Sequence, residues 1–141
     1  MRLELTKRAD YAIRTVMALA RTDADERLSV RRIAAEQKIP ERFLPQVMGD
    51  LVRAGLVEGT IGRNGGYRLT RPAADLSLLD IVEAVEGDSR RRTCVLRGGP
   101  CARSGVCDVH DAFVGAQEAL LAELAEARVG DLIRPPIRRL C

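Results

Sequence analysis

The sequence predicts a mainly α-helical protein with a small β-hairpin wing, arranged as a winged helix–turn–helix followed by a long helix. Three observations support this fold class. Apolar residues recur at helical spacing in the first third of the chain, a glycine-rich turn then separates two short β-favouring runs, and an Ala-, Leu- and Glu-rich segment covers about residues 106–128. Aromatic residues make up only 3% of the chain, so the core must consist mainly of Ala, Leu, Val and Ile.

The first three helices are expected at residues 7–21, 30–38 and 41–54. Thr6 and Ser29 precede the first two helices and are residue types that cap helix N-termini. Pro40 ends the second helix and suits the start of the third, and Gly55 is a natural C-cap. The expected buried stripe of the third helix consists of Phe43, Leu44, Val47, Met48 and Leu51.

The rest of the chain contains a hairpin and two further helices. The predicted strands are 56–58 and 67–69, with a turn over 59–66. Ser77 is expected to cap a helix over 78–85, which Gly87 closes. A cysteine-rich loop spans about 88–105, and the long helix follows. Its apolar seam is formed by Phe113, Leu120, Leu121 and Leu124.

Charge and sequence motifs are compatible with a nucleic-acid-binding protein and argue against a membrane protein or an enzyme. The formal charge of +3 is mild, but arginines cluster in runs, which is compatible with nucleic-acid binding. We expect a cytoplasmic protein without a membrane segment, since the N-terminus has no apolar signal region. An enzyme is not expected, because the chain has one histidine, no nucleophile elbow and no phosphate-binding glycine loop before a helix.

The helix order and the hairpin together predict binding to double-stranded DNA. In a winged helix–turn–helix the third helix enters the major groove and the wing reaches the minor groove. Arg42 and Gln46 share one face of the third helix and are side-chain types that read guanine and adenine. The other candidate DNA-binding residues are Arg31, Arg63, Asn64, Gly65 and Gly66. The alternative is that these charged faces are merely solvated and the glycines merely form a turn.

Three cysteines lie within fourteen residues: Cys94, Cys101 and Cys107, with His110 three residues after the last. Thiolates on one glycine-rich loop can hold a soft metal or an iron–sulfur cluster. Arginines within and beside this loop would favour the thiolate form. In the reducing cytosol a disulfide framework is the weaker interpretation. Cys141, the last residue, is not expected to take part.

Several motifs together resemble the iron–sulfur-responsive winged-helix regulators of the IscR and NsrR type. These motifs are the opening Thr6-Lys-Arg-Ala-Asp-Tyr-Ala-Ile-Arg-Thr, then Ser29-Val-Arg-Arg-Ile-Ala, Leu51-Val-Arg-Ala-Gly-Leu-Val, Arg63-Asn-Gly-Gly-Tyr-Arg-Leu and the three-cysteine loop. The likeness extends from residue 1 to about 133. It implies a homodimeric transcription factor that binds a palindromic operator and senses iron–sulfur status, nitric oxide or redox stress through a cluster.

The resemblance offers two candidates for the fourth cluster ligand. His110 would match the IscR arrangement, with a 2Fe–2S centre. Asp10, donated by the partner subunit, would match the NsrR arrangement, with a 4Fe–4S centre. Each has a simpler alternative: Asp10 forms an ion pair with Arg14, or His110 is an exposed residue near a helix start. The chain departs from the family's five-residue spacing, because six residues separate Cys94 from Cys101.

The resemblance also divides the chain into four parts. These are a DNA-binding domain (1–75), a connecting helix with the cluster loop (76–105), a dimerisation helix with a C-terminal turn (106–134) and a basic tail (135–141). Two other functions stay open. One is a cluster-free redox regulator that uses thiol chemistry or a zinc site made by the three cysteines and His110. The other is a regulator of the same fold that binds a partner protein.

Overall fold

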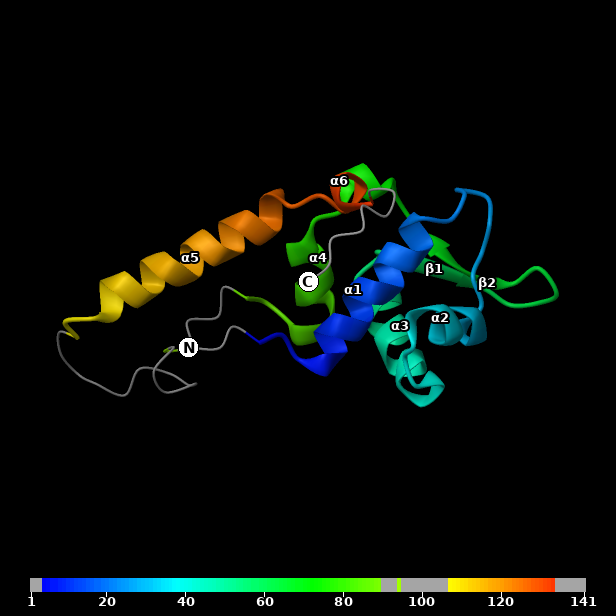
Figure 1. The fold of residues 1–141 in the computed structure, drawn as a ribbon, viewed down its shortest axis with the longest axis horizontal. Helices are drawn as coiled ribbons and strands as arrows, with labels where there is room; N and C mark the ends of the chain where they lie inside the picture. The colour runs from blue at the N-terminus through cyan, green and yellow to red at the C-terminus, as the bar shows by residue number, and fades with distance from the viewer. Residues whose placement is uncertain (1–3, 90–93, 95–106, 134–141) are drawn as a thin grey trace, which may run out of the picture.

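The computed structural model describes residues 4–89, 94 and 107–133, and Figure 1 shows their arrangement. The elements are α1 (Lys7–Ala20), α2 (Val30–Gln37), the 3₁₀ turn η1 (Glu41–Phe43), α3 (Leu44–Arg53), β1 (Val57–Thr60), β2 (Gly66–Leu69), the 3₁₀ turn η2 (Ala73–Asp75), α4 (Leu78–Glu86), α5 (His110–Glu126) and α6 (Val129–Leu132). The predicted fold class, mainly helical with one hairpin, is confirmed.

The helix caps are those that the sequence predicts. The Thr6 hydroxyl accepts a hydrogen bond from the backbone N–H of Ala9 at 3.1 Å, and the Ser29 hydroxyl accepts one from Arg32 at 3.2 Å. Each bond satisfies a backbone donor that lacks a partner within the helix. Lys38 ends α2 in the left-handed conformation, with φ of 53°, which turns the chain toward α3.

The third helix differs from the prediction in two respects. It is not continuous over 41–54: Glu41–Phe43 form a 3₁₀ turn, and α3 begins at Leu44. Pro45 explains the break, because its missing N–H is harmless only in the first turn of an α-helix. The expected burial of Phe43 is wrong, since this residue is 41% exposed. The other members of the predicted stripe, Leu44, Val47, Met48 and Leu51, are buried.

One hydrophobic core joins the helices. The helix α4 packs against α1 and α3, and α6 packs near η2. The largest buried side chains come from α2, α3, α4, α6 and the segments before α2 and α4: Leu28, Ile33, Leu44, Met48, Leu51, Leu76, Ile81 and Val129. Ser77 caps α4 in a reciprocal pair with Asp80, in which each side chain accepts a hydrogen bond from the other's backbone N–H. The position of α3 is therefore set by contacts with α1 and α4.

The hairpin pairs β1 with β2 in antiparallel register, from Val57 opposite Leu69 to Thr60 opposite Gly66. Leu28 adds one further bridge: its N–H donates to the carbonyl of Tyr67 at 3.0 Å, and the Tyr67 N–H donates back at 2.8 Å. This bridge fixes β2, near its turn end, to the segment before α2. The hairpin tip projects from the body of the molecule (Figure 1).

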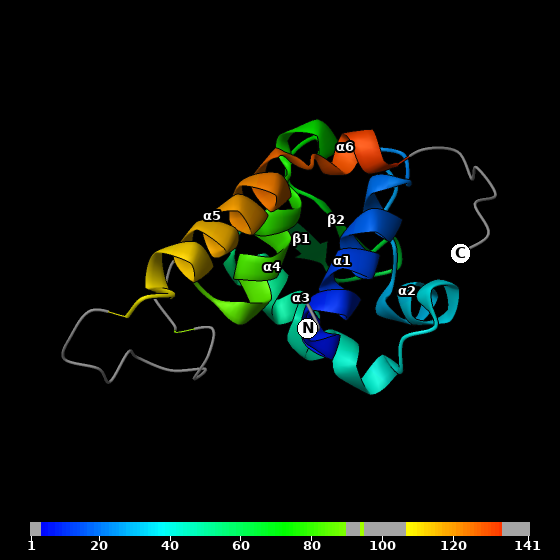
Figure 2. The same cartoon turned by 60° about the vertical axis from the view of Figure 1, so that its left-hand side comes forward.

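Helix α5 extends away from the body, as both ribbon views show (Figures 1 and 2). It begins at His110, four residues later than the predicted start at 106, and none of its residues is buried. The predicted seam is only partly covered: Leu120 is 41% exposed, while Phe113, Leu121 and Leu124 are half-buried. The segment after α5 is attached to the start of α4 by two backbone hydrogen bonds. The Leu78 N–H donates to the Ala127 carbonyl at 3.0 Å, and the Val129 N–H, at the start of α6, donates to the Leu76 carbonyl at 2.8 Å.

Within the part of the chain that the structure describes, no helix combines the length and the apolar composition needed to cross a membrane.

Candidate nucleic-acid interface and cysteine site

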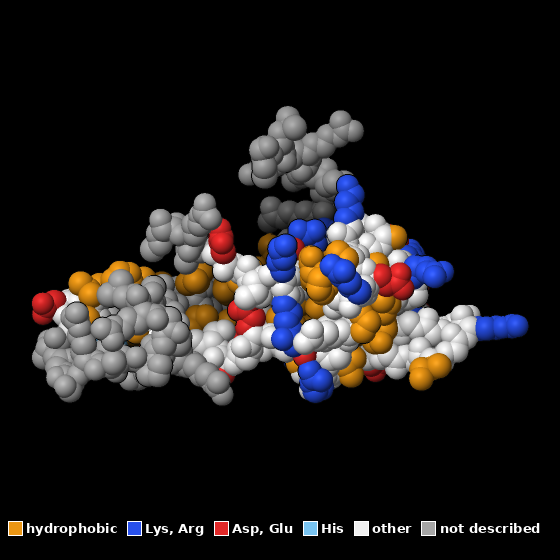
Figure 3. Space-filling view, turned by 90° about the horizontal axis from the view of Figure 1, so that it is seen from below, with side chains coloured by type: hydrophobic (Ala, Val, Ile, Leu, Met, Phe, Trp, Pro, Cys, Tyr) orange, Lys and Arg blue, Asp and Glu red, His pale blue; other side chains and the backbone are white. Residues whose placement is uncertain are grey.

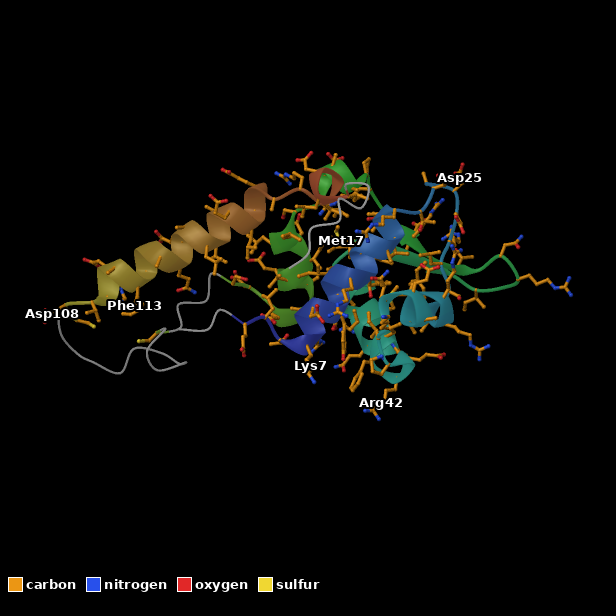
Figure 4. The ribbon with its side chains drawn as sticks, in the orientation of Figure 1. Lys7, Met17, Asp25, Arg42, Asp108 and Phe113 are labelled. Atoms are coloured by element: carbon orange, nitrogen blue, oxygen red, sulfur yellow. The ribbon has the colours of Figure 1, made fainter. Side chains whose placement is uncertain are left out.

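Arg42 lies in η1, just before α3, and its guanidinium stacks on the ring of Phe43. Its guanidinium carbon is 4.8 Å from the centroid of the Phe43 ring, and that ring lies 5.8 Å from the ring of Tyr11 on α1. Arg42 projects outward from this turn (Figure 4). A cation over an aromatic face is attracted by the ring quadrupole. The exposed Phe43 thus has a role that sequence reasoning missed, since it holds Arg42 in place.

The exposed side of the helix–turn–helix carries the other predicted helix residues. Gln46 is exposed on α3, whereas Val47 and Met48 next to it are buried. Arg31 is exposed in the first turn of α2. In the described ranges, neither Gln46 nor Arg31 makes a side-chain hydrogen bond or an ion pair. Their polar groups therefore have no partner among the described residues, and their contact with DNA stays a prediction.

Nearby arginines are instead held by acidic groups. Arg32 pairs with Glu26 at 2.6 Å and with Glu36 at 2.7 Å, and these bonds, that to Glu36 first, raise the pKa of the guanidinium. Arg53 at the end of α3 pairs with Asp50. Ion pairing thus distinguishes Arg31 from the adjacent Arg32, a difference that the sequence alone does not contain. Figure 3 shows Lys and Arg side chains projecting from the part of the molecule that holds the three helices and the hairpin.

The tip of the wing carries Arg63 and Asn64, both exposed. The two glycines that follow have a structural role. A Cβ atom on Gly65 would lie 2.4 Å from the Thr60 carbonyl oxygen, and one on Gly66, where φ is +135°, would lie 2.7 Å from the Leu28 carbonyl oxygen. Both positions therefore require glycine for the turn itself. Contact of these glycines with phosphates stays a prediction.

Two of the three loop cysteines are described. Cys94 and Cys107 are half-buried free thiols, and Cys101 lies outside the described residues. His110 is exposed as the first residue of α5, and its N–H donates to the Cys107 carbonyl at 3.0 Å. Cys107 and His110 therefore share one turn, which suits a thiolate–imidazole donor set for a soft metal. Over residues 4–89, 94 and 107–133, no group of three or more potential ligands is gathered at one point.

Asp10 lies in the first turn of α1 and pairs with Arg14, Oδ2 to Nη2 at 2.8 Å and Oδ1 to Nε at 2.9 Å. Arg14 also donates to the Gln37 carbonyl at the end of α2, at 3.4 Å. The ion pair between Asp10 and Arg14, which is the simpler interpretation of Asp10, therefore forms in this chain. Its carboxylate remains 42% exposed, so the predicted role as a ligand toward a partner subunit is neither supported nor opposed by this pair.

Three helices, a tight turn and an antiparallel wing, with basic and amide groups that have no partner among the described residues, define a winged helix–turn–helix DNA-binding protein. The chain belongs to the Rrf2 family: the family model, described as an iron-dependent transcriptional regulator, matches residues 5–135. It is therefore a transcriptional regulator and not an enzyme, and the resemblance drawn from the sequence motifs is confirmed at the level of the family.

Individual relatives agree with this assignment. The chain is 36% identical to protein aau3 of Rhizobium meliloti, over 98% of this chain and 91% of that protein. It is 34% identical to the HTH-type transcriptional repressor NsrR of Streptomyces coelicolor, over 95% and 90%. Among solved structures, the T. potens IscR has a TM-score of 0.77 at 21% identity, covering 93% of this chain and 86% of that one. CymR of B. subtilis has a TM-score of 0.76 at 23% identity, covering 94% and 97%. These two likenesses establish the fold alone.

Proposed function

We propose that this protein is a homodimeric cytoplasmic regulator that binds a palindromic DNA operator and carries an iron–sulfur cluster as its sensor. One observation carries the DNA-binding part of the proposal. The exposed side of the winged helix presents Arg42, Gln46 and Arg63 without acidic partners among the described residues, while Arg32 and Arg53 are ion-paired.

In this proposal α3 lies in the major groove. Arg42 and Gln46 would hydrogen-bond to base edges, and Arg31 would contact the phosphate backbone near the start of α2. The ring of Phe43 restricts the rotamers of Arg42 before DNA binds, which lowers the entropy cost of ordering this side chain. The wing would place Arg63 and Asn64 at the neighbouring minor groove.

The experiment for this step is selection of genomic DNA fragments with the purified protein, followed by anisotropy titrations on the selected operator. Replacing Arg42 by Ala is expected to cost about 1–3 kcal/mol and to relax the base preference at one operator position. Arg128→Ala is the matched control, because Arg128 is an exposed arginine at the start of α6. No sequence preference in the native protein would contradict the proposal and favour a regulator that binds a partner protein.

The proposed cluster ligands are Cys94, Cys101 and Cys107, with His110 or the partner subunit's Asp10 as the fourth. The half-buried free thiols of Cys94 and Cys107, the turn shared by Cys107 and His110, and the iron-dependent family description support this donor set. A bound cluster of either type, 2Fe–2S or 4Fe–4S, would supply a centre that reacts with oxidants or nitric oxide. The thiols would hold it, and the local arginines would help to keep them deprotonated.

Anaerobic reconstitution followed by Mössbauer spectroscopy tests the cluster. The native protein is expected to be coloured, and Cys101→Ser to be colourless, while Cys141→Ser serves as the control. A change of spectrum in His110→Ala but not in Asp10→Asn would identify the histidine, and the reverse result the aspartate. Zinc without iron or sulfide in the native protein would instead support a Cys₃His zinc site, and a metal-free protein would support thiol chemistry.

The proposed dimer would use α5. Its apolar side chains are only partly covered in the single chain: none is buried, and Leu120 is 41% exposed on a helix that extends from the body. Hydrophobic side chains are visible along this helix in Figure 3. Light scattering on Leu120→Asp tests this step, and a dimer that survives the substitution unchanged would place the interface elsewhere.

A further inference from the structure

Ile61 lies at the tip of the wing with its entire side chain in solvent, at 102% relative exposure. The other exposed large apolar residues in the described ranges are between 41% and 48% exposed. A single apolar side chain on a surface is ordinary. Ile61 differs because it contributes no burial to the fold and stands at the end of a projecting element (Figure 1).

We propose that Ile61 is an apolar wedge that enters the minor groove of the operator and partly unstacks one base step in each half-site. This inference rests on the DNA binding proposed above and adds a specificity-determining residue to it. Proteins that insert Ile, Leu or Phe between base steps bend the duplex and choose steps that unstack at low cost, notably pyrimidine–purine steps.

The backbone around Ile61 holds the side chain outward. Thr60, the residue before it, is the last residue of β1 and pairs with Gly66. Across the turn the Gly65 N–H donates to the Gly62 carbonyl at 3.0 Å, and Gly62 has φ of +121°. The bridge between Leu28 and Tyr67 anchors β2 one residue from the turn. A wedge must resist being pushed back by the base stack, and this closed turn on an anchored hairpin meets that need.

The positive charge beside Ile61 favours DNA over a protein as the partner of the wing tip. Arg63 is exposed two residues away and makes no ion pair with any described residue, so the tip presents a cation next to an apolar group. The negative potential of the minor groove attracts arginine. An isoleucine side chain has no donor or acceptor to satisfy there, but it can pack against base faces once a step opens. A protein partner could bind the apolar side chain of Ile61, but it would not require a cation such as Arg63 beside it.

The test uses the full-length protein and the operator selected as above, with 2-aminopurine replacing one adenine at a time in the half-site flanks. The native protein is expected to raise the fluorescence at one step in each half-site, because 2-aminopurine brightens when it unstacks. Ile61→Ala is expected to abolish this rise and to weaken operator binding about ten-fold. Ile61→Met should retain the rise, since it keeps an apolar side chain of similar reach.

Leu132→Ala is the matched control, because it truncates a 42%-exposed apolar side chain on α6. It should leave affinity and fluorescence unchanged. The wedge is overturned if Ile61→Ala binds the operator within two-fold of the native protein, or if native binding produces no unstacking signal at any step. Absence of operator binding by the native protein would overturn the proposed function and the wedge together, so the two failures are distinguishable. Thermal melting should match the native curve, because Ile61 is not buried.

Discussion

Arg8 on α1 donates a hydrogen bond from Nε to Oδ2 of Asp50 on α3 at 2.8 Å, and Asp50 is only 4% exposed. The guanidinium of Arg53 pairs with the other carboxylate oxygen. A buried carboxylate of the proposed DNA-contacting helix is thus held between two cations, one of them from a different helix. Since a buried charge is costly without such partners, this arrangement fixes α3 against α1.

Asp50→Asn should lower the free energy of unfolding by about 2 kcal/mol, because the amide keeps the shape but loses the charge that strengthens the hydrogen bonds from Arg8 and Arg53. Urea denaturation followed by circular dichroism measures this change. The control is Glu26→Gln, which removes an exposed partner of Arg32 and should cost much less, since exposed ion pairs are screened by water. Equal effects of the two substitutions would show that burial of Asp50 does not matter.

Ser77→Ala tests the cap of α4. The Ser77 hydroxyl accepts from the Asp80 N–H at 3.1 Å, and the Asp80 carboxylate accepts from the Ser77 N–H at 2.9 Å. The substitution should cost about 1 kcal/mol of unfolding free energy. Ser29→Ala removes a one-sided cap at an exposed residue and should cost less in the same denaturation experiment. A larger loss at Ser29 would contradict the importance of the reciprocal pair.

Gly66→Ala should disrupt the wing while leaving the helices folded. The added methyl would lie 2.7 Å from the Leu28 carbonyl oxygen, on a residue with φ of +135°. We expect at least a ten-fold loss of operator affinity in anisotropy titrations, with helical circular dichroism retained. Gly115→Ala is the control, because a methyl there meets no atom within 4 Å and replaces a glycine inside α5. It should leave DNA binding intact and favour the helix by up to about 1 kcal/mol.

The features that could be predicted from the sequence are those set by neighbouring residues. The caps Thr6, Ser29 and Ser77 act within three positions, and the hairpin follows from its glycine turn, so all were expected correctly. The break before α3 is equally local, because it follows from Pro45, although the helix over 41–54 was expected to be continuous. Helix type and hairpin position therefore required no tertiary information.

What the sequence did not reveal depends on contacts between distant segments. Phe43 was expected in the core because its spacing fits the buried stripe, yet it lies beside Tyr11 and under Arg42. No local pattern indicates that Asp50 is buried, since its partner Arg8 lies 42 residues away. Likewise, Arg31 and Arg32 are equivalent in sequence, and only the positions of Glu26 and Glu36 separate their roles.

Arg63→Ala distinguishes a phosphate or groove contact at the wing from base reading by α3. Arg63 is exposed at the hairpin tip and forms no ion pair with a described residue, so removing it should not alter stability. A cation near phosphates displaces condensed counterions when it binds. Operator affinity should therefore fall for all sequences alike, and the slope of log K against log salt should decrease by about one for each subunit.

Anisotropy titrations at several salt concentrations, on the operator and on unrelated DNA, measure both effects. Gln46→Ala provides the contrast, because an uncharged side chain that reads a base edge should change the preference between the two DNAs and leave the salt slope unchanged. If Arg63→Ala instead altered sequence preference without altering the slope, Arg63 would be reading bases. The proposed roles, phosphate contact by the wing and base contact by α3, would then be reversed. The experiment separates these roles because neutralising phosphate charge changes the salt dependence of binding, whereas contacting base edges changes its sequence dependence.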